Sequence, residues 1–312
     1  MTNSQGGNIM DLAGQDLASV PDSLRELTTI ENLELDRNRL TSLPEWIGGL
    51  EDLQTLSLYS NQLSALPASL WRLTKLQTLN ISENHLPLLA DEIGKLTDLR
   101  MLDLGHNEFS ELPETIGNLR RLRFLYLSNN GITAVPASLG NLSRLIYLNL
   151  TDNRLTSLPD AVGNLTELIE LRLYGNFLSV LPESLRRLTK LRELHAMKNK
   201  LRALPSSIGK LTQLKKLMLE GNELEALPTS IGGLAALTDL DLRNNRLTAL
   251  PESVAKLKSL RFLDLRANNL SALPADLQEL PALEKLDLRW NKDLTVPDWI
   301  PHLEQRGCVV FT

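Results

Sequence analysis

Asparagine recurs every 23 residues along this 312-residue chain, without a single insertion. The twelve positions are Asn38, Asn61, Asn84, Asn107, Asn130, Asn153, Asn176, Asn199, Asn222, Asn245, Asn268 and Asn291. Gln15 continues the same register one step earlier, and proline follows six residues after the asparagine in eleven of the twelve units, Ala90 being the exception. A strict period of this length predicts a solenoid in which each unit is one coil stacked on its neighbours.

One unit, LQTLSLYSNQLSALPASLWRLTK, illustrates how each coil is expected to fold. Leu56 and Leu58 alternate with polar residues, which is typical of a strand with one buried face. Pro67 has a fixed φ and no N–H, so it suits the start of a short helical turn on the outer side. The leucines expected to point inward from the returning segment are Leu63, Leu66, Leu70 and Leu73.

The repeated asparagine and glycine have structural explanations. Each coil turns sharply after its strand and buries backbone groups that a sheet cannot pair. An amide side chain both donates and accepts hydrogen bonds, so a column of asparagines can satisfy those groups from coil to coil. Glycine lies ten residues after the asparagine in seven units, for example Gly48 and Gly117. We expect it to let adjacent outer turns pack closely, or to end a short helical turn.

The unit LxxLxLxxNxLxxLPxxIGxL resembles the 23-residue leucine-rich repeat of the intracellular Ras-suppressor-like group, and the resemblance extends from about Leu12 to Leu303. It implies an α/β fold: a right-handed solenoid or horseshoe with a parallel sheet on the concave face and short helical or extended segments on the convex face. It also implies protein binding through the concave face, sometimes in GTPase signalling. The Gly-Val-Tyr-Trp ending of plant members and the cysteine-rich caps of extracellular relatives are absent, and no kinase, GTPase or ubiquitin-ligase segment is attached.

The repeats predict a single domain over residues 1–312. It would consist of an N-terminal cap with a degenerate first turn over 1–27, twelve repeats over 28–300 and a C-terminal cap over 301–312. The caps are needed because terminal strands would otherwise expose sheet edges and an open core. We expect Trp299, Leu303 and residues 309–311 to cover the last coil with one final short strand, and the chain to be complete.

Charge and composition narrow the classes of partner. The net charge is −5 and the pI is near 5.5, which argues against a nucleic-acid or anionic-membrane binder. The single cysteine, Cys308, excludes a disulfide within the chain, and its sequence context suggests a buried small residue. The N-terminal sequence lacks a secretory signal, and no stretch is apolar enough to span a bilayer. These features predict a cytoplasmic protein, which we expect to be a monomer rather than a dimer.

The residues six, four and two positions before each asparagine should point out of the concave sheet. Tyrosine, arginine and methionine are typical of binding hot spots, and exposed aromatic patches usually mark a partner site. Aromatic residues also favour strands for structural reasons, but we favour the binding interpretation. The predicted partner-binding residues are Met101, Phe124, Tyr126, Tyr147, Arg172, Tyr174, His195, Met197 and Met218. Nearer the C-terminus, three Asp-Leu-Arg segments starting at Asp241, Asp264 and Asp287 predict a solvated, self-paired charged surface.

No pattern for catalysis or cofactor binding stands out. A glycine-rich phosphate loop, a CxxC pair and an HExxH motif are all missing. The sequence therefore predicts a non-enzymatic protein-recognition scaffold that binds a partner protein in intracellular signalling, with no cofactor and no metal. Three alternatives stay open: an effector acting on a host protein, an engineered scaffold without a natural partner, and a metal-dependent activity. The last would use Glu83, His85, His106 and Glu108, although ordinary surface hydrogen bonding is favoured for these four residues.

Overall fold

A computed structural model of the protein describes residues 8–312. These residues form two compact units, of which the first ends at Arg154 and the second spans Leu155–Thr312. Each unit is a stack of coils with its own buried leucine core. The boundary between the units lies within the predicted repeats 28–300, and residues 1–7 of the predicted N-terminal cap lie outside the described residues. A single domain over 1–312 stays a prediction.

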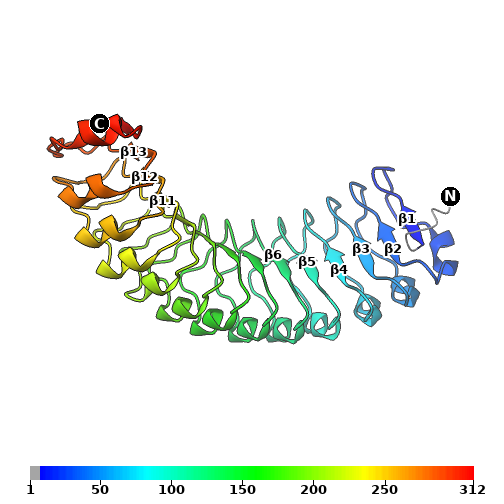
Figure 1. The fold of residues 1–312 in the computed structure, drawn as a ribbon. Helices are drawn as coiled ribbons and strands as arrows, with labels where there is room; N and C mark the ends of the chain where they lie inside the picture. Colours follow the sequence, from blue (N-terminus) through cyan, green and yellow to red (C-terminus); the bar gives the residue numbers. More distant parts are fainter. Residues whose placement is uncertain (1–7) are drawn as a thin grey trace. The chain divides into compact units, whose positions relative to one another are not determined.

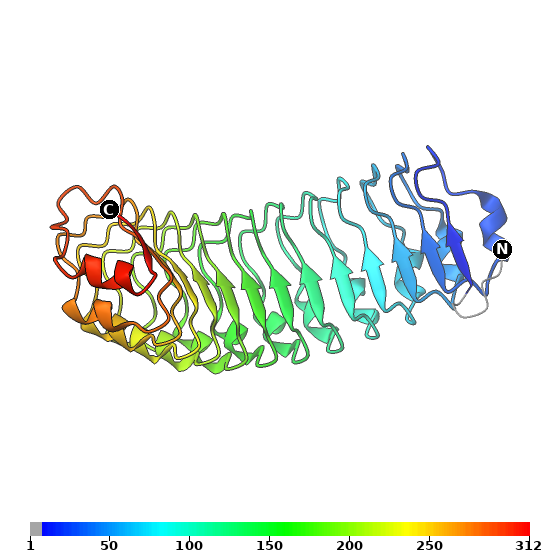
Figure 2. The same cartoon turned by 45° about the horizontal axis from the view of Figure 1, so that its top comes forward.

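In the first unit, the strands form one side and the short helices the other (Figures 1 and 2). The strands pair in parallel in chain order. They are β1 Ile9–Asp11, β2 Asn32–Glu34, β3 Thr55–Ser57, β4 Thr78–Asn80, β5 Met101–Asp103, β6 Phe124–Tyr126 and β7 Tyr147–Asn149. The 3-10 helices are η1 Asp22–Glu26, η2 Glu45–Gly49, η3 Ala68–Arg72, η4 Asp91–Lys95, η5 Glu114–Asn118 and η6 Ala137–Asn141.

The second unit repeats this arrangement, again with parallel pairing in chain order. Its strands are β8 Glu170–Arg172, β9 Glu193–His195, β10 Lys216–Met218, β11 Asp239–Asp241, β12 Phe262–Asp264, β13 Lys285–Asp287 and β14 Val309–Phe311. Its helices are η7 Asp160–Asn164, η8 Glu183–Arg187, η9 Ile208–Lys210, η10 Thr229–Gly233, η11 Glu252–Lys256, η12 Ala275–Glu279 and α1 Ile300–Gln305. The predicted solenoid of parallel strands with short helical outer segments is confirmed.

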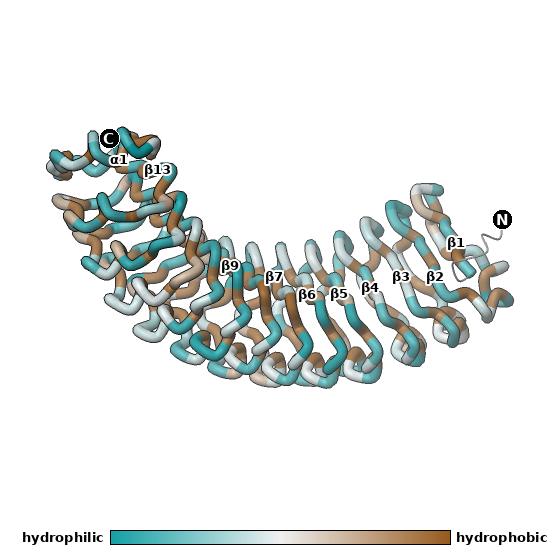
Figure 3. Tube along the Cα trace, in the orientation of Figure 1, coloured by the Kyte–Doolittle hydropathy of each residue, from teal (hydrophilic) through white to brown (hydrophobic). Residues whose placement is uncertain are grey.

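Hydrophobic periodicity sets the orientation of every coil. In each strand from β2 to β13 the central leucine is buried and its two neighbours lie on the opposite face, as the period of two requires. Hydrophobic and hydrophilic residues therefore alternate along the coils of each unit (Figure 3). In the coil that contains β3, five leucines are fully buried, as predicted: Leu56, Leu58, Leu63, Leu70 and Leu73. Leu66 is only half-buried. The core is built from layers of mostly aliphatic side chains, one layer per coil, with Phe109 and Trp71 as buried aromatic members.

The prolines begin the outer helices, as predicted. Pro44 has an extended backbone (φ −72°, ψ 149°) and stands directly before η2. Its missing N–H is no loss there, and its carbonyl accepts the first helical hydrogen bond from Ile47 N at 3.0 Å. The helix ends at Leu50, whose N–H donates to Ile47 O. The equivalent position in η4 is Ala90, which adopts the same conformation without the ring.

The asparagine column pairs the backbone of successive coils, which confirms the predicted role. Asn84 donates from Nδ2 to Leu58 O of the preceding coil at 3.0 Å and to Ile81 O of its own coil at 3.1 Å. Its Oδ1 accepts from Leu63 N at 2.9 Å. The same pattern recurs from coil to coil within each unit, so the amides replace the sheet hydrogen bonds that end where the chain turns.

The residue before each asparagine has a left-handed backbone, which the sequence had not predicted. Its φ lies between 48° and 67° in all twelve coils. This conformation costs a non-glycine residue about 1 kcal/mol and needs a surrounding structure that enforces it. Only Gly175 and Gly221 adopt it freely; the other residues are Arg37, Ser60, Glu83, His106, Asn129, Asp152, Lys198, Asn244, Ala267 and Trp290.

The C-terminal cap closes the core of the second unit. Helix α1 buries Ile300 and Leu303, and Cys308 is buried beside it, as predicted. Strand β14 pairs with β13, which confirms the predicted final strand. The Arg306 guanidinium donates to Gln278 O at 2.7 Å, and so fixes the cap to the last 3-10 helix.

Candidate functional site

The strand face is defined here as the sheet surface formed, in each unit, by the side chains two, four and six positions before the asparagines. No helix of the unit covers it, because the helices lie on the opposite side (Figures 1 and 2). These side chains were expected to point out of the sheet into solvent, but most of them are half-buried. The reason is that neighbouring strands lie about 4.8 Å apart, so side chains in one column shield each other.

In the first unit, the strand face brings four predicted residues together. Met101, Phe124 and Tyr147 stand directly opposite one another on β5, β6 and β7. The rings of Tyr126 and Tyr147 pack with centroids 4.9 Å apart at an angle of 39°. All four side chains are half-buried, and the guanidinium of Arg123 lies 5.9 Å from the centre of the Phe124 ring. We call Met101, Phe124, Tyr126 and Tyr147 the aromatic group.

In the second unit, the strand face holds the other five predicted residues. Met197 and Met218 are half-buried, and Lys198 Nζ lies 5.1 Å above the centre of the Tyr174 ring. Arg172 Nε contacts Glu170 Oε1 at 2.5 Å, and His195 Nε2 contacts Glu193 Oε2 at 2.9 Å. The arginine and the histidine, predicted as hot-spot residues, are thus both paired with carboxylates.

Glu170 and Glu193 form the part of this surface that the sequence prediction missed. They are directly opposite on β8 and β9, and with His195 they place three possible metal-ligand atoms within 4.8 Å of one another. Their 23-residue spacing within one column was the available signal. Arg172 pairs with Glu170, and Lys216 Nζ contacts Glu193 at 3.1 Å, so two cations already compensate the carboxylates. A metal ion would have to displace them.

The pKa of Glu193 reflects this pairing. Partial burial raises it, but the hydrogen bonds from His195 and Lys216 outweigh burial, and the net pKa lies below the usual range. The carboxylate therefore stays ionised at neutral pH as the centre of an ion-pair cluster. This arrangement favours specific charge recognition over proton transfer, since a general base needs a pKa near the working pH.

The four residues considered for a metal-dependent activity separate into different contacts. His85 Nδ1 lies 3.5 Å from Glu108 Oε1, and both side chains are largely exposed. His106 Nε2 instead lies 3.2 Å from Asn129 Nδ2, and the side chain of Glu83 is hydrogen-bonded with Tyr59. Within residues 8–312, no three of these four side chains bring ligand atoms together. Their geometry is that of surface hydrogen bonding.

The Asp-Leu-Arg segments pair with one another, as predicted, but they form a half-buried ladder and not a solvated surface. Arg266 contacts Asp264 at 2.5 Å and Asp287 at 3.4 Å, and Arg289 contacts Asp287 at 2.7 Å. The side chain of Asp287 is fully buried. Burial raises its pKa, but the hydrogen bond from Arg289 and the charges of both arginines outweigh burial, and the net pKa is lowered. Asp287 is directly opposite Phe311 of β14, a neighbour that the columns of the repeats alone do not reveal.

The pKa of Asp103, on β5 beside the aromatic group, is shifted upward, in the opposite direction from the pKa of Asp287. Burial raises its pKa, although a hydrogen bond from Gly105 N at 3.0 Å opposes the shift. Asn80 and Asn149 make the same turn hydrogen bond in nearby coils without a charge. We therefore expect Asp103→Asn to stabilise the protein at pH 7, by up to about 1 kcal/mol after allowance for solvent screening.

The pH dependence of that gain provides the check. A carboxyl whose folded pKa exceeds its unfolded value destabilises the fold fully above the folded pKa, and not at all once both states are protonated. The difference in urea-unfolding free energy between wild type and Asp103→Asn should thus shrink as the pH falls from 7 toward the unfolded pKa, about 3.9. A difference that stays constant over this range would show that burial of the charge is not its cause.

Comparisons with known proteins agree with this architecture. Residues 85–203 and 202–305 match the family described as leucine-rich repeat region, and residues 28–86 match the family leucine rich repeat. No curated protein matches the chain significantly. Within residues 8–312, no helix has both the length and the apolar character needed to cross a membrane.

Several solved structures are similar. A leucine-rich-repeat protein of Leptospira interrogans is 31% identical with a TM-score of 0.85, and the match covers 95% of this chain and 82% of that one. The plant peptide hormone receptor RGFR1, in complex with RGF2, is 28% identical with a TM-score of 0.77; the match covers 91% of this chain but only 51% of the receptor. An internalin of Listeria monocytogenes shares the fold, at 23% identity and a TM-score of 0.79 over 94% of this chain and 82% of that one.

The family matches extend over almost the whole repeat region, and the coils have the strand, turn and outer helix that this repeat specifies. The chain therefore belongs to the leucine-rich-repeat family.

Proposed function

We propose that this chain is a non-enzymatic recognition protein that binds a partner protein through its strand face, as a monomer in the cytoplasm, in a signalling role. The observation that carries the proposal is the aromatic group, in which the stacked rings of Tyr126 and Tyr147 adjoin Phe124 and Met101 on a sheet face that no helix of the unit covers. Tyrosine offers a large apolar area with little conformational entropy to lose, and methionine offers a flexible apolar side chain that adapts to a partner, which suits both to central interface positions.

The second unit supports the proposal with a different surface. Tyr174, Met197 and Met218 provide apolar contacts, and the cluster of Glu170, Glu193 and His195 adds fixed charges. Interfaces commonly combine apolar anchors with charges that orient the partner. Leucine-rich-repeat folds serve as protein-interaction scaffolds in general, and the similar plant receptor is described in complex with RGF2.

The experiment compares affinity capture from native lysate by wild type and by Tyr126→Glu/Tyr147→Glu/Tyr174→Glu, followed by titration calorimetry with the purified partner. We expect the triple variant to lose at least about 30-fold in affinity, since a hot-spot truncation costs 2 kcal/mol or more. The double variant Tyr126→Glu/Tyr147→Glu and the single variant Tyr174→Glu separate the contributions of the two units.

The matched control is Tyr59→Glu, the same substitution on the strand face of the first unit but outside the aromatic group. Thermal unfolding monitored by circular dichroism checks that every variant is folded, and light scattering measures the oligomeric state. Equal capture by wild type and the triple variant would refute the assignment of the site. A dimer that dissociates only in the triple variant would instead identify a second copy of the chain as the occupant of this face.

A further inference from the structure

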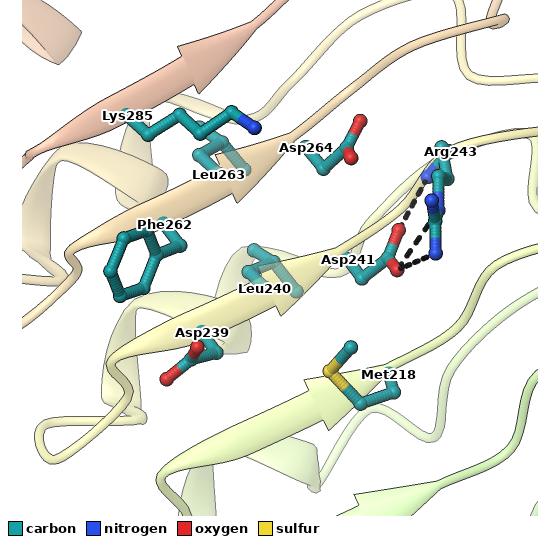
Figure 4. Close-up of a pocket in the computed structure, with 9 residues that line it drawn as sticks. All are labelled: Met218, Asp239, Leu240, Asp241, Arg243, Phe262, Leu263, Asp264 and Lys285. Atoms are coloured by element: carbon teal, nitrogen blue, oxygen red, sulfur yellow. Dashed lines mark hydrogen bonds and ion pairs between the residues drawn. The ribbon is translucent and has the colours of Figure 1, made fainter. Parts of the chain in front are cut away.

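The strand face of the second unit contains a pocket of about 200 Å³ between β10, β11, β12 and β13. Figure 4 shows its residues: Phe262 and Met218 stand on two sides, with Asp239, Asp241 and Asp264 between and around them. Its base is formed by core leucines that are nearly fully buried. The pocket thus combines apolar walls with three carboxylates.

The strand register brings the carboxylates to the pocket. Asp241 and Asp264 are directly opposite on β11 and β12, while Asp239 is opposite Phe262. Like charges at directly opposed positions repel each other, so the sheet carries a local excess of negative charge unless cations compensate it. The charges around the pocket therefore decide what it can hold.

Two cations line the pocket, and both are engaged elsewhere in part. Arg243 contacts Asp241 at 3.1 Å but is shared with Glu220, which it contacts at 2.9 Å. Lys285 Nζ lies 5.2 Å from the centre of the Phe311 ring and makes no ion pair among the described residues. Arg266, which stands outside the pocket lining, contacts Asp264 at 2.5 Å, so Asp241 and Asp264 each have an arginine partner. Asp239 is the carboxylate of the pocket that makes no ion pair among the described residues.

Asp239 is the least compensated of the three carboxylates. Thr238 Oγ1 donates to it at 2.6 Å, and within residues 8–312 it makes no ion pair. The basic residues close to it have other partners: Lys216, directly opposite on β10, contacts Glu193 at 3.1 Å, and the guanidinium of Arg261 donates to both carboxylate oxygens of Glu284. Asp239 is half-buried beside the Phe262 ring and is available to a further cation.

We propose that this pocket receives a lysine or arginine side chain of the partner protein, an inference that rests on the proposed function of the strand face. The aliphatic stem of such a side chain would lie against Phe262 and Met218, and its cationic head would contact Asp239 beside Asp241. A bare divalent cation fits poorly, because the three carboxylates do not bring ligand atoms within 4.8 Å of one another. Met218 connects the pocket to the predicted partner-binding residues on the same face.

The chemistry of the pocket can be tested without any partner. The full-length protein, labelled with ¹³C-methyl methionine, is titrated with butylammonium, butylguanidinium and the neutral isostere butylurea. Met218 reports from inside the pocket, and Met10 of the first unit, which lies outside the proposed binding residues, serves as an internal reference. We expect a saturable shift of the Met218 methyl resonance with the two cations in the millimolar range, and at least fivefold weaker binding of butylurea.

Variants decide whether the carboxylate is responsible. Asp239→Asn should weaken binding of butylguanidinium at least fivefold, whereas Glu34→Gln, which removes a carboxylate from the strand face of the first unit, should not change it. Equal binding of butylurea and the cations, or binding that survives Asp239→Asn, would overturn the proposal. The absence of a saturable Met218 shift with any cation would overturn it as well.

Measurements on the captured partner separate this inference from the proposed function. Asp239→Asn should weaken partner binding at least fivefold, with Glu34→Gln as the matched control. If the tyrosine variants abolish binding and Asp239→Asn has no effect, the pocket proposal fails while the proposed function stands. If the cationic probes bind at Met218 but the tyrosine variants retain the partner, the recognition surface proposed above is wrong and the chemistry assigned to the pocket is retained.

Discussion

Replacing Gly48 with alanine is expected to lower the free energy of unfolding by about 2–3 kcal/mol. A Cβ at this position would lie 2.3 Å from the carbonyl oxygen of Ser69 and 2.8 Å from its carbonyl carbon. These are backbone atoms of η3 in the next coil, so they cannot rotate away. The coils must move apart instead, which loosens the leucine layers between them. Equilibrium urea unfolding followed by circular dichroism measures the effect.

The adjacent residue provides the control for this prediction. Gly49 belongs to the same helix η2, but a Cβ there would meet nothing within 4 Å, and its φ does not lie in the left-handed region. Gly49→Ala should therefore be neutral, or stabilise the protein by about 0.4–1 kcal/mol through the reduced entropy of the unfolded chain. Similar losses for both variants would show that the close approach of the coils does not account for the glycine at position 48.

The same contact recurs wherever glycine occupies this position opposite a serine. Cβ atoms at Gly117 and Gly163 would lie 2.5 Å and 2.4 Å from the carbonyl oxygens of Ser138 and Ser184. Ser69, Ser138 and Ser184 also bury hydroxyl groups that have no hydrogen-bond partner among the described residues, which fits an interface too tight to include water. Of the two roles expected for the glycines from the sequence, close packing of outer turns is thus the one found.

Much of the coil could be predicted because each signal has a local physical cause. The alternation around Leu56 predicts the strand, Pro67 predicts the start of η3, and the Asn61 amide predicts the pairing between coils. Each of these residues acts on backbone groups a few positions away or one period away. A strict 23-residue period fixes both sets of neighbours, so no long-range folding information is needed.

The left-handed position before each asparagine was not predicted, for a reason that its residues make clear. Arg37, Ala267 and Trp290 have no preference for positive φ, and they adopt it because the asparagine and the next coil fix the backbone on both sides. The glycines at 175 and 221, with Asn129, Asp152 and Asn244 in the same column, were the only hint.

The candidate site was only partly accessible from sequence. Columns of residues predicted which side chains share the strand face, and Met101, Phe124, Tyr126 and Tyr147 do adjoin one another there. The columns could not predict side-chain rotamers, so the ion pairs that Glu193 makes with His195 and Lys216 were missed. The pocket beside Phe262 was missed too, because its depth depends on the sizes and rotamers of the neighbouring side chains.

Replacing Asn84 with leucine is expected to cost about 3–5 kcal/mol, although the two side chains have the same number and branching of heavy atoms. Asn84 is 5% exposed and makes four hydrogen bonds at 2.9–3.1 Å, to Leu58 O, Ile81 O, Ser82 O and Leu63 N. Leucine would leave the Leu63 N–H buried without a partner, which costs about 1–3 kcal/mol. It would also remove one of the two hydrogen bonds that each of the three carbonyls accepts, since Leu58 O, Ile81 O and Ser82 O keep only Asn61 Nδ2, Asn107 Nδ2 and Ser60 N. Because two of the four bonds join the coil to its predecessor, the loss should affect both coils.

Hydrogen exchange can show which residues lose stability in Asn84→Leu, and the same substitution at an exposed asparagine provides the control. Amide protection in Asn84→Leu should fall first over residues 55–86, where the broken bonds lie, before it falls elsewhere in the first unit. Asn141→Leu, the same substitution at an exposed position on η6, should change the unfolding free energy by no more than about 0.5 kcal/mol. If both variants lost the same amount, the asparagine column would owe its regularity to something other than the pairing of buried backbone. If Asn84→Leu alone were destabilised but protection fell evenly over the whole unit, the column would act on the global stability of the stack rather than coil by coil.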